Sequence, residues 1–138
     1  MKKIIIAILL VSITSLFAKE AIKAQKEIVG TWRFALVDGK EFPGEFYMKF
    51  TSDSIAKSWP SPHEGSFNTK DGVSTGDYRI DEEFFYIVKE KSKDIKSRYE
   101  LTEDTFTMKT EDGHVLVYHR VKNPPEPGQL KGTQNKTE

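Results

Sequence analysis

The sequence predicts an all-β protein: an antiparallel, up-and-down, eight-stranded β-barrel with a short N-terminal lead-in and a disordered C-terminal tail. Three observations support this fold class. Apolar and polar side chains alternate in segment after segment, and turn-forming residues separate those segments at short intervals. After the N-terminal leader, no segment keeps a helical period.

Residues 1–18 have the pattern of a secretory signal peptide. Two lysines precede an apolar run over 4–13, and Ala18 is a small residue suited to cleavage, with Ala24 as a second candidate. The run is shorter than the roughly 20 apolar residues of a membrane span, although an uncleaved N-terminal anchor is the alternative. We therefore expect an exported protein, periplasmic or secreted, without an integral membrane span after signal cleavage.

Cysteine usage and charge exclude several classes of function. The chain has no cysteine, so it forms no disulfide, carries no cysteine-linked lipid anchor and offers no thiolate to a metal or substrate. It has 21 basic and 21 acidic residues, and removal of the two leader lysines leaves 19 basic against 21 acidic. This balance does not fit a nucleic-acid-binding protein. The lysine-rich stretch 89–98 contains interspersed acids and is interpreted as a solvated hairpin tip rather than a phosphate site.

The chain divides into a signal peptide (1–18), a lead-in turn or short helix (19–27), the barrel (28–122) and a tail (123–138) rich in proline, glycine and polar residues. The predicted strands are 29–37, 45–51, 54–60, 73–80, 83–90, 94–102, 105–111 and 114–122. Residues 60–70 form either a long loop or one further short strand. An even strand count, which a closed meander requires, favours the loop.

Alternation also predicts which side chains share a face of each strand. The groups expected on one face are Trp32, Phe34 and Leu36; Phe46, Met48 and Phe50; Tyr99 and Leu101; and Phe106 and Met108. Asp38-Gly39 and Asp112-Gly113 are dipeptides that favour the positive φ angles of tight hairpins. The strands should therefore pair in sequence order, and closure would remove the two exposed edges of an open sheet.

Gly30, Trp32 and Arg120 form the predicted structural motif of the closed end. Trp32 lies near the start of the first strand and Arg120 near the end of the last, and closure makes these strands antiparallel neighbours. An arginine over the indole face is favourable by about 0.5–2 kcal/mol, and its stem covers apolar surface. Gly30, without a side chain, is expected to let the lead-in cross tightly beneath.

The sequence Gly30-Thr31-Trp32, followed by a strand meander and the terminal Arg120, resembles the lipocalins of the wider calycin superfamily. The stretch 78–122 is similar to small bacterial lipocalin-like domains, and the whole resemblance covers about residues 28–122. It implies a ligand in the open end of the barrel. Full-length lipocalins are longer, usually have a disulfide and carry a C-terminal helix, for which the proline-rich tail leaves no room.

No catalytic motif is present, so we expect no enzymatic activity and no cofactor. His114 and His119 are five residues apart on one strand and therefore point to opposite faces. A zinc site would need His63 and Glu64 to converge from the long loop. We expect no metal and interpret the histidines as exposed polar residues.

Two hypotheses for function remain. The first is a pocket for a small apolar or amphipathic molecule at the end opposite the closed-end motif. Its candidate ligand-binding residues are Trp59, Phe67, Tyr78, Tyr86, Tyr99 and Tyr118. The second is a packed barrel that binds a protein through the 59–70 loop, as an inhibitor or module of the cell envelope. A cavity favours the first hypothesis, whereas an exposed Trp59 and a filled interior favour the second.

Overall fold

A computed structural model describes residues 19–60 and 72–125. A helix spans residues 19–27, where the sequence allowed a turn or a short helix. The strands that follow are β1 (Gly30–Val37), β2 (Lys40–Glu41), β3 (Phe46–Phe50), β4 (Ile55–Pro60), β5 (Ser74–Ile80), β6 (Phe84–Ile87), β7 (Ile95–Leu101), β8 (Thr105–Lys109) and β9 (Val115–Val121). The predicted signal peptide, most of the tail and the segment 61–71 lie outside the described residues.

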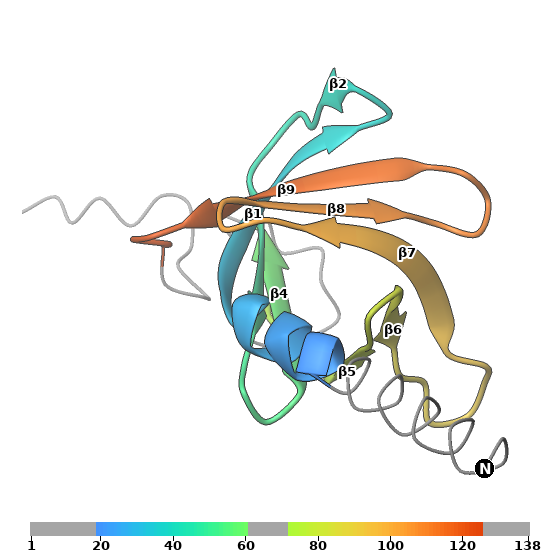
Figure 1. The fold of residues 1–138 in the computed structure, drawn as a ribbon. Coiled ribbons are helices and arrows are strands. Elements are labelled where there is room, and N and C mark those ends of the chain that lie inside the picture. The colour runs from blue at the N-terminus through green and yellow to red at the C-terminus, as the bar shows by residue number, and fades with distance from the viewer. Residues whose placement is uncertain (1–18, 61–71, 126–138) are drawn as a thin grey trace, which may run out of the picture.

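The strands close into an antiparallel barrel, which confirms the predicted fold class. Each barrel strand pairs with the next along the chain, and β1 also pairs with β9. Figure 1 shows β1 and β9, the first and last strands of the barrel, side by side. β1 and β3–β9 form the eight-stranded up-and-down barrel, and β2 is a two-residue extension paired only with β1. Closure leaves no long unpaired edge within the barrel.

The short strand β2 follows from the Asp38-Gly39 turn. Asp38 has a φ of 50° and Gly39 a φ of 77°, the positive values of a two-residue hairpin turn. Val37 pairs with Lys40 across this turn, so the chain folds back on β1 before it enters the barrel again at β3. The turn was therefore expected, but the extra strand after it was not.

The prediction that Leu36 shares a face with Trp32 and Phe34 is wrong. The β1–β9 register shifts between Phe34 and Leu36, which is a β-bulge that inserts one residue into β1. Phe34 pairs with Tyr118, whereas Leu36 pairs with Val117, the next position along β9 and therefore the opposite face. The bulge places Leu36 outside the barrel.

The predicted strand 83–90 is shorter in the structure, where β6 ends at Ile87. Val88 N still donates to Asp77 O at 3.0 Å, so the pairing with β5 extends one residue beyond the strand. Residues 89–93 are polar and supply no apolar alternation to continue it. They form instead a connection to β7 at one end of the barrel.

The middle of the barrel is filled by aromatic rings. Phe106 is fully buried and lies within 6 Å, between ring centroids, of Trp32, Phe50, Phe85 and Tyr118. Two of these pairs, with Phe50 and with Phe85, are edge-to-face, an arrangement that aromatic quadrupoles favour. The rings come from five different strands, so their burial couples the whole barrel into one core.

The helix over residues 19–27 lies across one end of the barrel (Figure 1). Ala24 and Ile28 belong to the buried core, with Ile28 fully buried. Gln25 Nε2 donates to the hydroxyl oxygen of Tyr78 at 3.0 Å. The helix therefore closes this end with apolar contacts and one hydrogen bond into the interior. In residues 19–60 and 72–125, no helix has both the length and the apolar character needed to cross a membrane.

Candidate functional site at the open end of the barrel

The two ends of the barrel differ, and the closed end is built around Trp32 and Arg120. These residues pair across β1 and β9, and Arg120 Cζ lies 4.1 Å from the centre of the Trp32 ring. The guanidinium donates to the carbonyls of Glu27 and Val29, and Trp32 Nε1 donates to the carbonyl of Ile28 at 2.8 Å. Carbonyls at a helix C-terminus lack hydrogen-bond partners within the helix. Arg120 and Trp32 donate to these carbonyls and so connect the end of the helix to the barrel.

Gly30 is required by Arg120 rather than by the lead-in, in contrast to the sequence-based expectation. A Cβ at Gly30 would lie 2.6 Å from Arg120 Nη1. The φ of Gly30 is +137°, a conformation that side chains with a Cβ rarely adopt. The absent side chain therefore gives the guanidinium its place over the indole ring.

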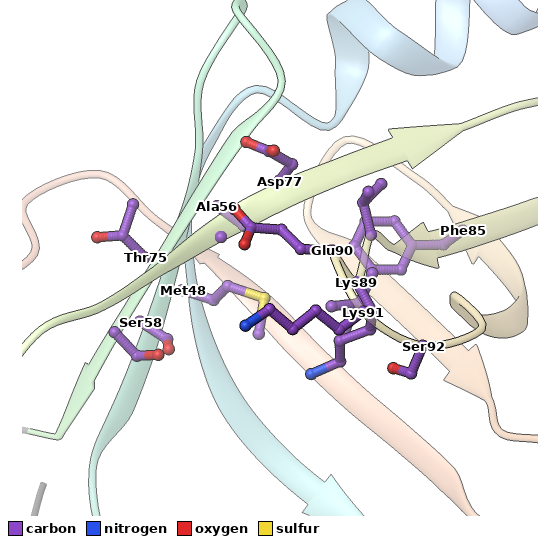
Figure 2. Close-up of a pocket in the computed structure, with 14 residues that line it drawn as sticks. Met48, Ala56, Ser58, Thr75, Asp77, Phe85, Lys89, Glu90, Lys91 and Ser92 are labelled. Atoms are coloured by element: carbon purple, nitrogen blue, oxygen red, sulfur yellow. The ribbon is translucent and has the colours of Figure 1, made fainter. Parts of the chain in front are cut away.

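The opposite end holds a cavity of about 720 Å³. Its inner wall is formed by Met48 of β3, Ala56 of β4, and Phe85 and Ile87 of β6. The hydroxyl-bearing Ser58 and Ser74 lie nearer the mouth, as Figure 2 shows for Ser58. The floor is therefore apolar and the rim is polar and charged, and a volume in this range is typical of small-molecule sites.

The cavity lies on the β4–β6 side because aromatic rings fill the β1–β9 side. Phe34 stacks on Tyr118 with ring centroids 4.9 Å apart, and Phe42 packs on Phe34 at 4.6 Å. Phe42 reaches this position through the extra strand β2, after which its N–H donates to Ala35 O at 2.9 Å. On the other side, inward positions are occupied by Ser58, which has a small side chain, and by Gly76, which has none, and this leaves space.

The rim of the cavity is completed by the connection between β6 and β7, residues 88–92. Its course is fixed by the Val88–Asp77 hydrogen bond and by a second one from Lys89 N to Asp94 Oδ1 at 3.1 Å. Asp94 also pairs with Arg79 at 3.8 Å. Two hydrogen bonds thus hold this connection at the mouth, one to Asp77 of β5 and one to Asp94 at the end of the connection itself. The residues that it places there are Lys89, Glu90, Lys91 and Ser92.

Tyr78 and Tyr99, predicted to bind ligand, point inward but belong to the closed half of the barrel. The Tyr78 hydroxyl donates to Thr51 O at 2.8 Å, and the Tyr99 hydroxyl donates to Asp81 O. Burial raises the pKa of both phenols, that of Tyr99 to about 12. These hydroxyls are occupied by backbone carbonyls, and neither residue is among those that line the open-end cavity.

Tyr118 and Tyr86 are also placed differently from the prediction. Tyr118 is 5% exposed and packs between Phe34 and Phe106, and burial raises its pKa to about 12. Tyr86 pairs with Lys96 across β6 and β7 on the face opposite the buried Phe85, and Arg79 Cζ lies 4.0 Å from its ring centre. Tyr118 therefore fills the core, and Tyr86 lies on the outer surface.

Trp59 does not line the cavity either. It pairs with Tyr47, and both lie on the outward face of β3 and β4, because Met48, Phe50 and Ala56 belong to the core face. The two rings stack with centroids 6.0 Å apart, and Trp59 is only 2% exposed. In the described part of the chain its Nε1 has no hydrogen-bond partner. Phe67, with the rest of the proposed 59–70 contact loop beyond Pro60, lies outside the described residues.

Sequence reasoning missed most of the residues that line the cavity. Met48 was expected to face inward, but nothing local distinguished an inward residue beside a cavity from one in a packed core. Lys89 and Lys91 belong to a stretch interpreted as a solvated hairpin tip. A signal was available: this stretch connects two strands at the end opposite Trp32 and Arg120, so it had to lie at the mouth of the barrel.

On the surface, the titratable side chain of His114 lies beside two acids. Its Nδ1 lies 2.8 Å from Asp38 Oδ2, and its Nε2 lies 3.6 Å from Asp112 Oδ2. The hydrogen bond to Asp38 raises the pKa of His114, and hydrogen bonds from Val115 N and His114 lower the pKa of Asp38. Among residues 19–60 and 72–125, no group of three or more histidine or acidic side chains is arranged to hold a metal ion. His63 and Glu64 lie outside that set.

Comparison of the chain with protein-family profiles and with curated protein sequences finds no match. The class of protein is therefore defined by its fold and its site: a closed, eight-stranded antiparallel barrel with one capped end and one end that holds a cavity.

Proposed function

We propose that this chain is an exported, lipocalin-like protein that binds a small apolar or amphipathic molecule in the open end of its barrel. The observation that supports this function is the cavity of about 720 Å³ opposite the Trp32–Arg120 end. Eight-stranded barrels have interiors that are either packed solid or able to hold one small ligand. Here the half beside the helix is packed, and the other half contains a cavity on its β4–β6 side.

The lipocalin-like assignment rests on the arrangement of the closed end. A Gly-x-Trp at the start of the first strand and an arginine from the last strand resemble that family, and Arg120 stacks on Trp32. Export rests on residues 1–18, whose two lysines and short apolar run have the pattern of a signal peptide. Together they suggest a carrier or sequestering protein of the periplasm or the extracellular medium.

Binding of a protein through the Trp59 loop is less well supported. An exposed Trp59 and a filled interior would favour it, but Trp59 is 2% exposed and the interior contains a cavity.

The first test is native mass spectrometry of the protein purified gently from its host, compared with its denatured mass. A discrete added mass that is lost on denaturation supports a bound small molecule and gives its mass. The second test measures the fluorescence of the neutral apolar dye N-phenylnaphthylamine during titration with the protein. We expect saturable binding with a stoichiometry of one.

Two neighbouring residues of β4 provide a matched pair of variants for the dye titration. Ser58 lines the cavity, whereas Lys57 is exposed on the opposite face of the same strand. Ser58→Phe should fill the space and abolish dye binding, and Lys57→Phe should leave it unchanged. If both variants bind the dye like the unmodified protein, with unchanged melting temperatures, the dye does not occupy the cavity and the proposed site is wrong.

A further inference from the structure

The cavity has an apolar interior and a charged mouth that includes two lysines. Phe85 and Ile87 line its wall, while Lys89 and Lys91, from the connection that follows β6, line its rim. In Figure 2 both lysine side chains extend over the opening, and their nitrogen atoms lie on the side of Met48. A molecule whose apolar part lies against Phe85 would leave its other end beside these two ammonium groups.

The two ammonium groups are not neutralised by neighbouring acids in the described part of the chain. The ion pairs found in residues 19–60 and 72–125 involve Lys23, Arg79, Arg98 and His114, but neither Lys89 nor Lys91. The carboxylate of Asp94 accepts a hydrogen bond from the backbone N–H of Lys89 and forms an ion pair with Arg79. Asp94 therefore fixes the position of the Lys89 backbone, and its negative charge is paired with Arg79 rather than with Lys89 or Lys91.

Glu90 and Asp77 also line the cavity, so the rim is not uniformly basic. Glu90 lies between the two lysines in sequence, yet forms an ion pair with neither in the structure. In Figure 2 its carboxylate points toward Ala56, away from the lysine nitrogens. The positive and negative groups at the mouth therefore lie apart: the ammonium groups of Lys89 and Lys91 are on the side of Met48, and the carboxylate of Glu90 is on the side of Ala56.

We propose that the ligand of this cavity is an anionic amphiphile: a single alkyl chain held by Met48, Phe85 and Ile87, with an acidic head group between Lys89 and Lys91. This inference rests on the proposed function, because it names the chemical class of the molecule in the same cavity. A carboxylate and a phosphate share the chemistry that the lysines recognise. Both lysines are exposed, so solvent and salt weaken the attraction.

The test measures displacement of bound N-phenylnaphthylamine by four compounds with the same alkyl chain: dodecanoate, dodecyl phosphate, dodecanol and dodecyltrimethylammonium. At low ionic strength we expect the two anions to bind about threefold to tenfold more tightly than the alcohol, and the cation to bind most weakly. The advantage of the anions over dodecanol should shrink as salt is added. The ratio between the two anions shows which head group the rim prefers.

The variant Lys89→Gln/Lys91→Gln should bind dodecanol as before and lose the preference for the anions. Lys93→Gln is the matched control, because Lys93 lies in the same connection but does not line the cavity. Equal displacement by the anions and dodecanol in the unmodified protein overturns the inference about charge and leaves the proposed site intact. Dye binding that none of the four compounds displaces also overturns it, whereas failure of the dye itself to bind overturns the proposed function.

Discussion

Substitution of Gly30 tests how the closed end is built. Gly30→Ala adds a Cβ that would lie 2.6 Å from Arg120 Nη1, far inside the 3.5–4.0 Å of favourable contact between heavy atoms. It also places a side chain on a residue with φ of +137°. The guanidinium must then leave its position over Trp32 and its hydrogen bond to Val29 O at 2.9 Å.

The expected cost has two parts. An unfavourable backbone conformation costs about 1–3 kcal/mol, and loss of the arginine–indole contact costs about 0.5–2 kcal/mol. We therefore expect Gly30→Ala to lower the free energy of unfolding by about 1.5–5 kcal/mol. Urea denaturation, followed by tryptophan fluorescence and circular dichroism, measures the difference. Gly76→Ala is the control, since a Cβ there meets no atom within 4 Å, and its effect should stay within about 1 kcal/mol.

A double-mutant cycle with Arg120→Ala separates the two parts. Without the guanidinium, Gly30→Ala should retain only its backbone cost, so the coupling free energy should be about 0.5–2 kcal/mol. If Gly30→Ala costs the same with and without the arginine side chain, the crowding at Arg120 does not explain the glycine, and the reasoning about the closed end is refuted.

Three further predictions concern the core and the titratable groups. Trp32→Ala, at a fully buried ring, should lower the free energy of unfolding by about 3–5 kcal/mol in the same urea assay, and an unchanged midpoint would contradict the closed-end assignment. Asp38→Asn should lower the pKa of His114, measured by NMR titration of its ring protons, whereas Asp104→Asn should not, because Asp38 raises that pKa. Because the pKa of His114 is higher in the folded than in the unfolded protein, its ion pair with Asp38 stabilises the fold below pH 6.5. This contribution to the free energy of unfolding is lost as the pH rises through the folded-state pKa. Burial raises the pKa of Tyr118 from 10.0 to about 12, so its contribution to stability is complete below pH 10 and falls as pH rises to 12; in Tyr118→Phe that part of the alkaline loss should be absent, and an identical pH profile would contradict it.

The barrel could be predicted from local features of the amino-acid sequence. Period-two alternation and turn residues are local properties, and they located all eight barrel strands, although β6 is shorter than predicted. The closed end was also predictable, because closure makes the first and last strands neighbours and brings Trp32 opposite Arg120. The prediction of the closed end requires only the order of the strands and the position of Trp32 and Arg120 within the first and last strands.

Alternation predicted the inward faces of β3, β7 and β8, but for β4 and for the end of β1 the inward face depends on the tertiary structure. In β4 the more apolar alternate positions, Ile55 and Trp59, suggest an inward face, yet the register with β3 pairs Trp59 with the outward Tyr47. A single bulge likewise moved Leu36 to the outside. Register and bulges depend on partners distant in sequence, and a shift of one residue exchanges the faces of a strand.

The choice between an open pocket and a packed interior, which the sequence analysis left open, could not be made from the sequence for a related reason. The cavity exists because Phe42, carried inward after β2, helps fill one side of the barrel, while small residues such as Ser58 and Gly76 leave the other side open. Whether an interior is filled depends on the summed volumes of side chains from many strands at one level of the barrel. The alternation of each strand, taken separately, contains no information on that sum.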